Sequence, residues 1–273
     1  MVIFPPCKIN LGLHILSKRE DGFHNIETAF YPIDALSDVL EIIPNNQNHT
    51  TFKQKGIEIE QHSGLNLVEK ANLLLKQDFN LPFVDIFLYK NIPVGAGLGG
   101  GSSDAAFTLK LLNKLFNLCL NEEQLIRYAS VLGSDCPFFV KNNPAIGTNR
   151  GEKLKPFSIT QLSGKHIVIV KPNMNISTAD AYKNCKPAPK DISLTEILLQ
   201  PLSDWKNTLV NDFEKTLFPV YPELKTIKEF LYQQGAAYAS VSGSGSALFG
   251  IFSEEIPSLS FQKDYFVFHG KLG

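Results

Sequence analysis

The stretch Pro93–Ala106 reads PVGAGLGGGSSDAA and places a cluster of glycines and two serines directly before a predicted helix. Glycine leaves more chain entropy to be lost on folding, so such a cluster usually marks a backbone that turns sharply or approaches something closely. Ser102 or Ser103 can cap the helix, and backbone amides at a helix N-terminus attract anions. We therefore expect the loop to bind phosphate. A tight structural turn is the alternative, since glycine and serine are also common in turns.

The loop does not fit the other familiar phosphate-binding patterns. Gly95, Gly97 and Gly100 satisfy G-x-G-x-x-G, which would suggest an NAD- or NADP-dependent oxidoreductase. However, the polar residues 90–93 separate the loop from the preceding strand, and its helix leads into a second helix, so the dinucleotide-binding context is missing. A P-loop would end in Gly-Lys-Ser/Thr, whereas this loop ends in Gly101–Asp104, and the protein-kinase motifs H-R-D and D-F-G do not follow.

Composition narrows the class of protein. The chain has 273 residues, is 44% hydrophobic and carries 26 basic and 27 acidic residues, which suits a globular protein without a nucleic-acid or membrane surface. Its four cysteines lie far apart without metal-ligand spacing, which argues for a reducing compartment and against structural zinc. The N-terminus lacks the basic segment of a signal peptide, and we expect a cytoplasmic protein.

Hydrophobic periodicity predicts strands, a helix, a strand, the glycine loop and then two helices. The strands 7–16 and 23–33 flank an Asp-Gly turn and form a predicted hairpin. The other predicted elements are strands at 37–44, 51–61, 84–93 and 165–172 and helices at 66–77, 103–116 and 121–132. A polar, Gly- and Pro-containing stretch at 141–156 predicts the domain boundary, which gives domains 1–155 and 156–273.

Three blocks resemble the signatures of the GHMP kinases, which phosphorylate small molecules. The glycine loop is similar to their second signature, residues 5–15 (PPCKINLGLHI) to the first and residues 240–252 (SVSGSGSALFGIF) to the third. With the blocks RxDGxH at 19–24 and GSDCPFF at 133–139, the chain resembles the members that use ATP to phosphorylate the 2-hydroxyl of a cytidine-diphospho-methylerythritol in non-mevalonate isoprenoid synthesis. The resemblance implies an α+β, two-domain GHMP kinase fold with an N-terminal ribosomal-protein-S5-like nucleotide domain, a C-terminal ferredoxin-like domain and an active site between them.

Lys8 and Asp135 are the candidate catalytic residues. The pattern alone also allows Lys8 to be a solvated edge lysine and Asp135 to be a helix N-cap. The resemblance implies instead that the two side chains pair at the acceptor hydroxyl. The aspartate would take or orient the hydroxyl proton, and the lysine would keep the aspartate ionised and offset charge on the transferring phosphoryl group.

On the nucleotide side, the resemblance implies that Asn66 and Leu67 lie near adenine and Lys90 near the ribose. The loop residues expected to bind ATP are Pro93, Gly95, Gly97, Leu98, Gly99, Gly100, Gly101, Ser102, Ser103 and Asp104, and the resemblance implies that Gly97 and residues 99–103 wrap the phosphates. Asp104 replaces an asparagine found in some relatives. ATP is the expected co-substrate and Mg²⁺ should accompany it, but the sequence assigns no carboxylate to the metal.

On the acceptor side, Phe23 and His24 follow the Asp-Gly turn, where the pattern alone favours a core aromatic and a surface histidine. The resemblance implies that Phe23 and Tyr182 stack on cytosine while His24 bonds its edge. Asn10 and Thr178 complete the implied acceptor site. The family more often has tyrosine at the position of Phe23, so stacking is retained and any hydroxyl contact is lost.

Two alternatives of other kinds stay open. A binding module without turnover would keep the phosphate loop, but the presence of both Lys8 and Asp135 argues against it. Another GHMP kinase, of the homoserine or mevalonate type, would act on a different alcohol, and the Phe23–His24 pair argues against that one. The expected partners are therefore ATP and a small-molecule acceptor, with neither nucleic acid nor membrane.

Overall fold

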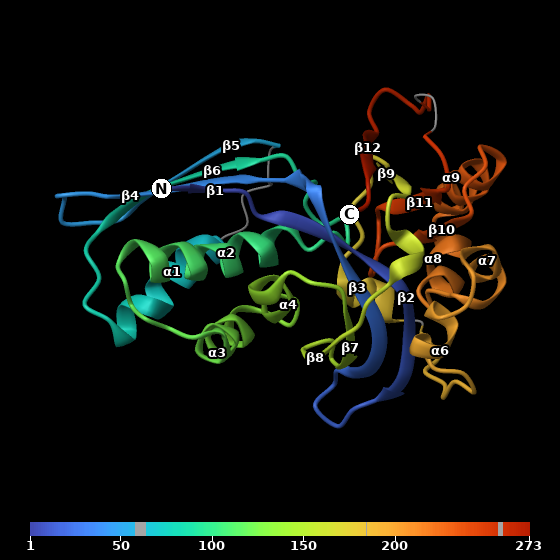
Figure 1. Cartoon of the computed structure of the whole chain (residues 1–273), viewed down its shortest axis with the longest axis horizontal. Helices are drawn as coiled ribbons and strands as arrows, with labels where there is room; N and C mark the ends of the chain where they lie inside the picture. The colour runs from blue at the N-terminus through green and yellow to red at the C-terminus, as the bar shows by residue number, and fades with distance from the viewer. Residues whose placement is uncertain (58–63, 184, 256–258) are drawn as a thin grey trace. The chain divides into compact units, whose positions relative to one another are not determined.

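The computed structural model describes residues 1–57, 64–183, 185–255 and 259–273 (Figure 1). The chain forms two compact units that alternate along the sequence. Unit 1 consists of residues 1–7, 36–94 and 99–143, and unit 2 of residues 8–35, 95–98 and 144–273. The sequence domains 1–155 and 156–273 stay a prediction. The compact units do not follow a single cut in the chain, because the first hairpin and the middle of the glycine loop belong to unit 2.

Unit 1 packs helices on one face of a four-stranded sheet, with α1 and α2 running along that face (Figure 1). The strand order is β1-β4-β6-β5, in which β4 and β6 are antiparallel and β5 and β6 are parallel. The strands are β1 (Val2–Ile3), β4 (Val39–Pro44), β5 (Thr51–Gly56) and β6 (Val84–Lys90). The helices are α1 (Leu67–Asp78), α2 (Gly100–Leu115), α3 (Glu122–Leu132) and α4 (Cys136–Lys141).

The sequence explains most of unit 1. Along β6, Val84, Ile86 and Leu88 alternate onto the buried face, as strand periodicity predicts. Helix α2 differs from its prediction because it begins at Gly100 rather than at 103. Its N-cap is Gly99 in the left-handed conformation, and that cap has no side-chain hydrogen bond. The prediction that Ser102 or Ser103 caps the helix is therefore wrong, since both serines lie inside its first turn.

Unit 2 contains two further four-stranded sheets, ordered β2-β3-β7-β8 and β10-β11-β9-β12. Their strands are β2 (Pro6–Lys18), β3 (His24–Ser37), β7 (Ala145–Asn149), β8 (Lys153–Pro156), β9 (His166–Lys171), β10 (Tyr238–Val241), β11 (Leu248–Phe252) and β12 (Phe266–Lys271). The helices are η1 (Thr160–Leu162), α5 (Thr178–Lys183), α6 (Leu194–Leu198), η2 (Leu202–Asp204), α7 (Trp205–Thr208), α8 (Glu214–Val220) and α9 (Pro222–Gln233). Helix α9 packs on β10 and β11, and apolar side chains from β2, β9 and α9 share one core.

The predicted hairpin is confirmed as β2 and β3, but β2 is covered more completely than its pattern indicates. Every residue from Pro6 to Ile15 is buried, on both faces of the strand. One reason is that the segment 210–212 runs along β2 and bonds to the backbone of Leu13. The predicted strand 51–61 is found as β5, and residues 58–61 lie outside the described residues. Among the helices described, none has the length and apolar character needed to cross a membrane.

Candidate active site

In unit 2, the middle of the glycine loop is held by the first strand and by the turn between β10 and β11. The carbonyl oxygen of Gly97 accepts hydrogen bonds from Lys8 Nζ at 2.9 Å and from Ser242 Oγ at 2.9 Å. The backbone N–H of Lys8 donates to the carbonyl of Leu98 at 2.9 Å. A Cβ on Gly97 would lie 2.0 Å from the carbonyl oxygen of Ser242, so this position accepts no side chain. Ser242, from the segment 240–252 that resembles the third signature, thus helps to hold the glycine loop in place.

Lys8 is fixed by a chain of buried hydrogen bonds. Its side chain is only 3% exposed, so the alternative of a solvated edge lysine is wrong. Lys8 Nζ donates to Asn10 Oδ1 at 2.5 Å, and Asn10 Nδ2 donates to Thr28 Oγ1 at 3.0 Å. Thr28 Oγ1 in turn donates to the carbonyl of Gly12 at 2.6 Å. Sequence analysis missed Thr28, which lies on the neighbouring strand β3 and carries no motif.

In unit 1, the end of the loop forms the first turn of α2. A Cβ on Gly100 would lie 2.9 Å from the side chain of Ile92, so the packing of unit 1 explains this glycine. Gly101, in contrast, is exposed and does not have a positive φ. A Cβ at this position would have Leu67 Cδ1, at 3.7 Å, as its nearest contact. A structural turn therefore does not account for Gly101, whereas a ligand that approaches the backbone would.

Asp135 stands at the N-terminus of α4 in unit 1. It occupies the N-cap position with φ −85° and ψ −15°, but within this described helix its side chain makes no capping hydrogen bond. Asp135 thus has the position of an N-cap residue, as the alternative interpretation predicts, but its side chain does not cap the helix. The next residue, Cys136, is buried, and burial raises the pKa of its thiol to about 12 despite a hydrogen bond with the side chain of Ser102. Unit 1 therefore places Ser102 of the glycine loop beside the residue that follows Asp135.

Lys90 and Asn66 both have structural partners. Lys90 is 1% exposed, and its ammonium contacts Asp38 and, at 2.7 Å, Asp104 Oδ2. Asn66 caps α1: its Oδ1 accepts from the N–H of Val68 at 3.0 Å, in a capping box. The expected contacts of Lys90 with ribose and of Asn66 with adenine stay predictions. The sequence did not single out Asp38, which lies inside the predicted strand 37–44.

Two of the predicted acceptor residues, His24 and Tyr182, lie against each other in unit 2. The rings of His24 and Tyr182 stack with centroids 4.6 Å apart and planes within 10°. Phe23 is 52% exposed, so the alternative of a core aromatic is wrong, and the Arg150 guanidinium lies over its ring at 4.9 Å. The predicted Phe23–Tyr182 sandwich stays a prediction, because His24 is the ring that lies against Tyr182 here. Thr178, at the start of the same helix α5, contacts Ser244 Oγ at 3.2 Å.

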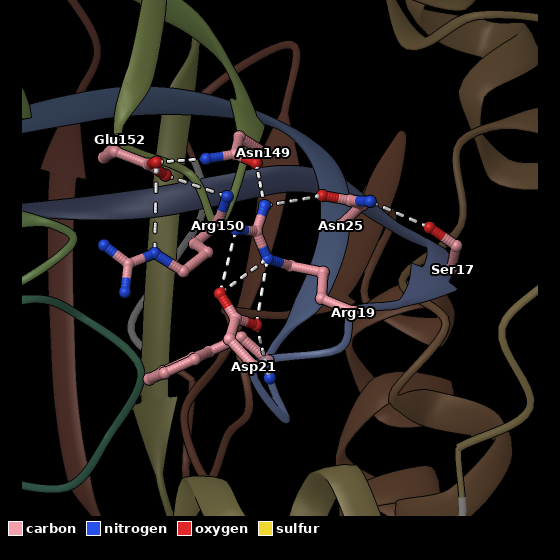
Figure 2. A network of polar contacts seen from close by, with 8 residues as sticks. Ser17, Arg19, Asp21, Asn25, Asn149, Arg150 and Glu152 are labelled. Atoms are coloured by element: carbon pink, nitrogen blue, oxygen red, sulfur yellow. Dashed lines mark hydrogen bonds and ion pairs between the residues drawn. The ribbon is translucent and has the colours of Figure 1, made fainter.

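Figure 2 shows the network that holds the turn between β2 and β3. The Arg19 guanidinium donates to both carboxylate oxygens of Asp21, to Asn25 Oδ1 at 3.1 Å and to Asn149. Asp21 Oδ1 also accepts from the N–H of Phe23 at 3.1 Å, which fixes the start of the acceptor segment. Sequence analysis treated Asn149 as part of a polar linker, and its distance along the chain hid this contact.

Among the residues that the structure describes, acidic and imidazole side chains do not gather into a metal site. Within the described ranges, no group of three His, Cys, Asp or Glu residues is placed to hold a metal ion. Protein-only magnesium cages need several oxygen ligands in octahedral geometry, and nucleotide-dependent enzymes more often hold the ion through one or two carboxylates plus phosphates.

Comparison with known proteins gives one consistent result. Residues 66–143 match the GHMP kinases N terminal domain, and residues 195–259 match the GHMP kinases C terminal domain. A 4-diphosphocytidyl-2-C-methyl-D-erythritol kinase of Bacteroides fragilis is 53% identical over 96% of both chains, and that of Cytophaga hutchinsonii is 49% identical over 93% of both.

Solved structures agree. The crystal structure of a 4-(cytidine 5'-diphospho)-2C-methyl-D-erythritol kinase has 33% identity and a TM-score of 0.78, and covers 92% of this chain and 90% of that one. The mevalonate kinase of Methanococcus jannaschii has a TM-score of 0.72 at 16% identity over 100% of this chain and 98% of that one, which shows a shared fold.

Proposed function

The chain belongs to the GHMP kinases and, within them, to the 4-diphosphocytidyl-2-C-methyl-D-erythritol kinases, and from this membership we propose that it transfers the γ-phosphoryl group of ATP to the 2-hydroxyl of 4-diphosphocytidyl-2-C-methyl-D-erythritol. It is a small-molecule kinase with an α+β GHMP fold. The reaction would supply a phosphorylated intermediate to non-mevalonate isoprenoid synthesis. Because ATP is a cytoplasmic substrate, we propose a cytoplasmic location.

The proposed step is an in-line displacement at phosphorus. The acceptor oxygen forms a bond to the γ-phosphorus, the bond from that phosphorus to the bridging β–γ oxygen breaks, and ADP leaves. The hydroxyl proton goes to Asp135 or, through it, to water. Since phosphoryl transfer is usually loose, Asp135, which stands at the start of α4, acts mainly by aligning the hydroxyl.

Lys8 would act on the charge that develops at the phosphoryl group. Its buried ammonium is already held at the Gly97 carbonyl of the glycine loop, so little reorganisation would be needed when phosphate is present. Asn10 and Thr28 fix the direction of that ammonium from the other side. This contact between the first-strand lysine and the glycine loop is the observation that carries the proposed function.

The start of α2 would bind the phosphates of ATP. Its first-turn amides follow an N-cap without a side-chain acceptor, and Gly101 leaves their surroundings open. Leu67, whose side chain lies beside Gly101, would line the adenine site. Mg²⁺ that arrives with ATP would neutralise negative charge on the phosphates.

The acceptor site would choose cytosine through His24 and two aromatic rings. Burial and the nearby Lys18 lower the pKa of His24, so its imidazole is neutral and offers one donor and one acceptor to a base edge. The His24 ring stacks on Tyr182 in this structure, so it would have to turn away before a base could stack on Tyr182. A site of this kind rejects an analogue that leaves its polar groups unpaired.

The test is turnover of the purified protein with ATP, Mg²⁺ and separate acceptors. We expect phosphorylation of the cytidine substrate, weak use of its uridine analogue, and neither homoserine nor mevalonate used. The His24→Ala variant should narrow the gap between the two nucleotides. Equal use of cytidine and uridine forms would refute the cytosine site, and preference for homoserine or mevalonate would move the chain to another GHMP activity.

A further inference from the structure

A buried charged cluster lies beneath the start of the proposed phosphate-binding helix. It consists of Asp38, just before β4, Lys90, at the end of β6, and Asp104, in the second turn of α2. These side chains are 0%, 1% and 2% exposed, respectively. Lys90 Nζ contacts Asp38 and lies 2.7 Å from Asp104 Oδ2. One ammonium thus meets two carboxylates out of contact with water.

The cluster holds both ends of the glycine loop within unit 1. Before the loop, Asp38 Oδ1 accepts hydrogen bonds from the backbone N–H groups of Asn91 at 2.6 Å and Ile92 at 2.8 Å. After the loop, Lys90 Nζ lies 3.3 Å from the position that a Cβ on Gly100 would take. The cluster therefore sits directly at the first residue of α2, whose amides would face phosphate.

The charges in the cluster do not balance. If all three groups are ionised, the cluster carries one negative charge, and a buried uncompensated charge is costly. Asp104 can relieve this cost by taking up a proton. It is the less stabilised carboxylate, because its Oδ1 has no hydrogen-bond partner among the described atoms. Burial is the main cause that raises the pKa of Asp104 to about 7, against the opposing effect of Lys90 and with the help of Asp38.

We propose that the Asp38–Lys90–Asp104 cluster positions the phosphate loop and that the charge on Asp104 tunes how strongly the start of α2 binds a nucleotide. A carboxylate near a helix N-terminus uses up part of the positive potential that would otherwise attract phosphate. The protonated or amide form leaves that potential to the ligand. Asp104 is thus a positioning residue, which acts through the loop and does not itself contact the reacting atoms. This inference rests on the proposed kinase function.

Two charged groups act most strongly on the Asp104 carboxyl. Lys90 on β6 and Asp38 before β4 act on its carboxyl. Helices α1, α3 and α4 and strand β4 also pack against α2, and Lys90 and Asp38 are the charged groups with the largest effect on the pKa of Asp104. A change in nucleotide affinity near neutral pH that depends on residue 104 therefore reports on this cluster.

The test measures the dissociation constant of a non-hydrolysable ATP analogue with Mg²⁺, without acceptor, between about pH 6 and 8. In the parent, we expect the dissociation constant to rise roughly three- to tenfold as pH rises through neutrality. The Asp104→Asn variant should keep the tight, low-pH value throughout. Glu123→Gln, which removes an exposed carboxylate at the start of α3, is the matched control and should follow the parent. Titration of the analogue itself affects all three proteins alike, so it drops out when the Asp104→Asn variant is compared with the parent.

The same pH response in parent and Asp104→Asn, no response in either, or weaker binding by Asp104→Asn at every pH would overturn the inference. If that variant does not fold, the carboxyl ¹³C signal of Asp104 in the parent decides: bound analogue should raise its pKa, since linkage is reciprocal. An unchanged pKa would also overturn it. A parent that binds no analogue would refute the kinase proposal together with this inference, whereas tight binding that ignores Asp104 refutes the inference alone.

Discussion

The glycine loop is fixed by partly buried hydrogen bonds to its backbone, whereas the turn between β2 and β3, which carries the predicted acceptor residue Phe23, presents exposed side chains that a surface network holds in place. Gly97 accepts two hydrogen bonds on its carbonyl and has no room for a Cβ. Phe23, by contrast, is half exposed, and charged side chains secure the turn that carries it. The comparison suggests that changes in the loop affect stability and chemistry together, while changes in the acceptor turn affect acceptor binding alone.

The largest effect is expected at the proposed catalytic pair. Asp135→Asn keeps the shape of the side chain but neither takes a proton nor orients a hydroxyl as a carboxylate does, so kcat should fall roughly 100-fold or more with ATP affinity near normal. Lys8→Met should lower kcat comparably. Kinetics with both single variants and the double variant provide the measurement. If the pair acts as a unit, the double variant loses far less than the product of the single losses, and losses that multiply would show that the two residues act separately.

The acceptor turn gives the cleanest contrast with the loop. Phe23→Ala removes an exposed ring, and loss of one aromatic ring from a stacked base costs about 1 to 3 kcal/mol of binding. We expect acceptor affinity to fall by a corresponding factor, roughly tenfold or more, with melting temperature and ATP affinity unchanged. Titration calorimetry with the cytidine substrate tests this. Tyr89→Ala, which removes an equally exposed ring from β6, is the control, and an equal loss in both variants would contradict a specific role for Phe23.

Gly101 can separate ligand binding from stability within the loop itself. A Cβ there meets only Leu67 at 3.7 Å, and alanine is favoured over glycine in a helix by up to about 1 kcal/mol. Gly101→Ala should therefore raise the free energy of unfolding but lower ATP affinity roughly tenfold, because the methyl group stands where phosphate would approach the amides. Gly64→Ala, at an open position outside the loop, controls for the added methyl group. Higher stability with unchanged ATP affinity would return Gly101 to a structural role.

The same comparison shows what the sequence predicts and what it leaves open. Glycines and strand periodicity report on the backbone, so the hairpin, the loop and the helix after it were predictable, apart from the start of α2 at Gly100. The Lys90–Asp104 contact joins residues of different elements through their side chains, and no local pattern encodes it. The stacking of His24 on Tyr182 is also not encoded locally, because the two residues lie on distant segments of the chain.

The smallest expected effect tests the hydrogen bonds behind Lys8. Thr28 receives a hydrogen bond from Asn10 Nδ2 and so directs Asn10 Oδ1 toward the ammonium of Lys8. Thr28→Val loses both hydrogen bonds of the hydroxyl, of which only the one from Asn10 orients Lys8. One hydrogen bond contributes about 1 kcal/mol, so kcat should fall roughly fivefold with little change in the KM for ATP. Thr28→Ser retains the hydroxyl and should restore most of kcat. Because both variants disturb packing at the same buried position, a purely structural role would lower stability and kcat in both, while rescue by serine alone assigns the effect to the orientation of Lys8.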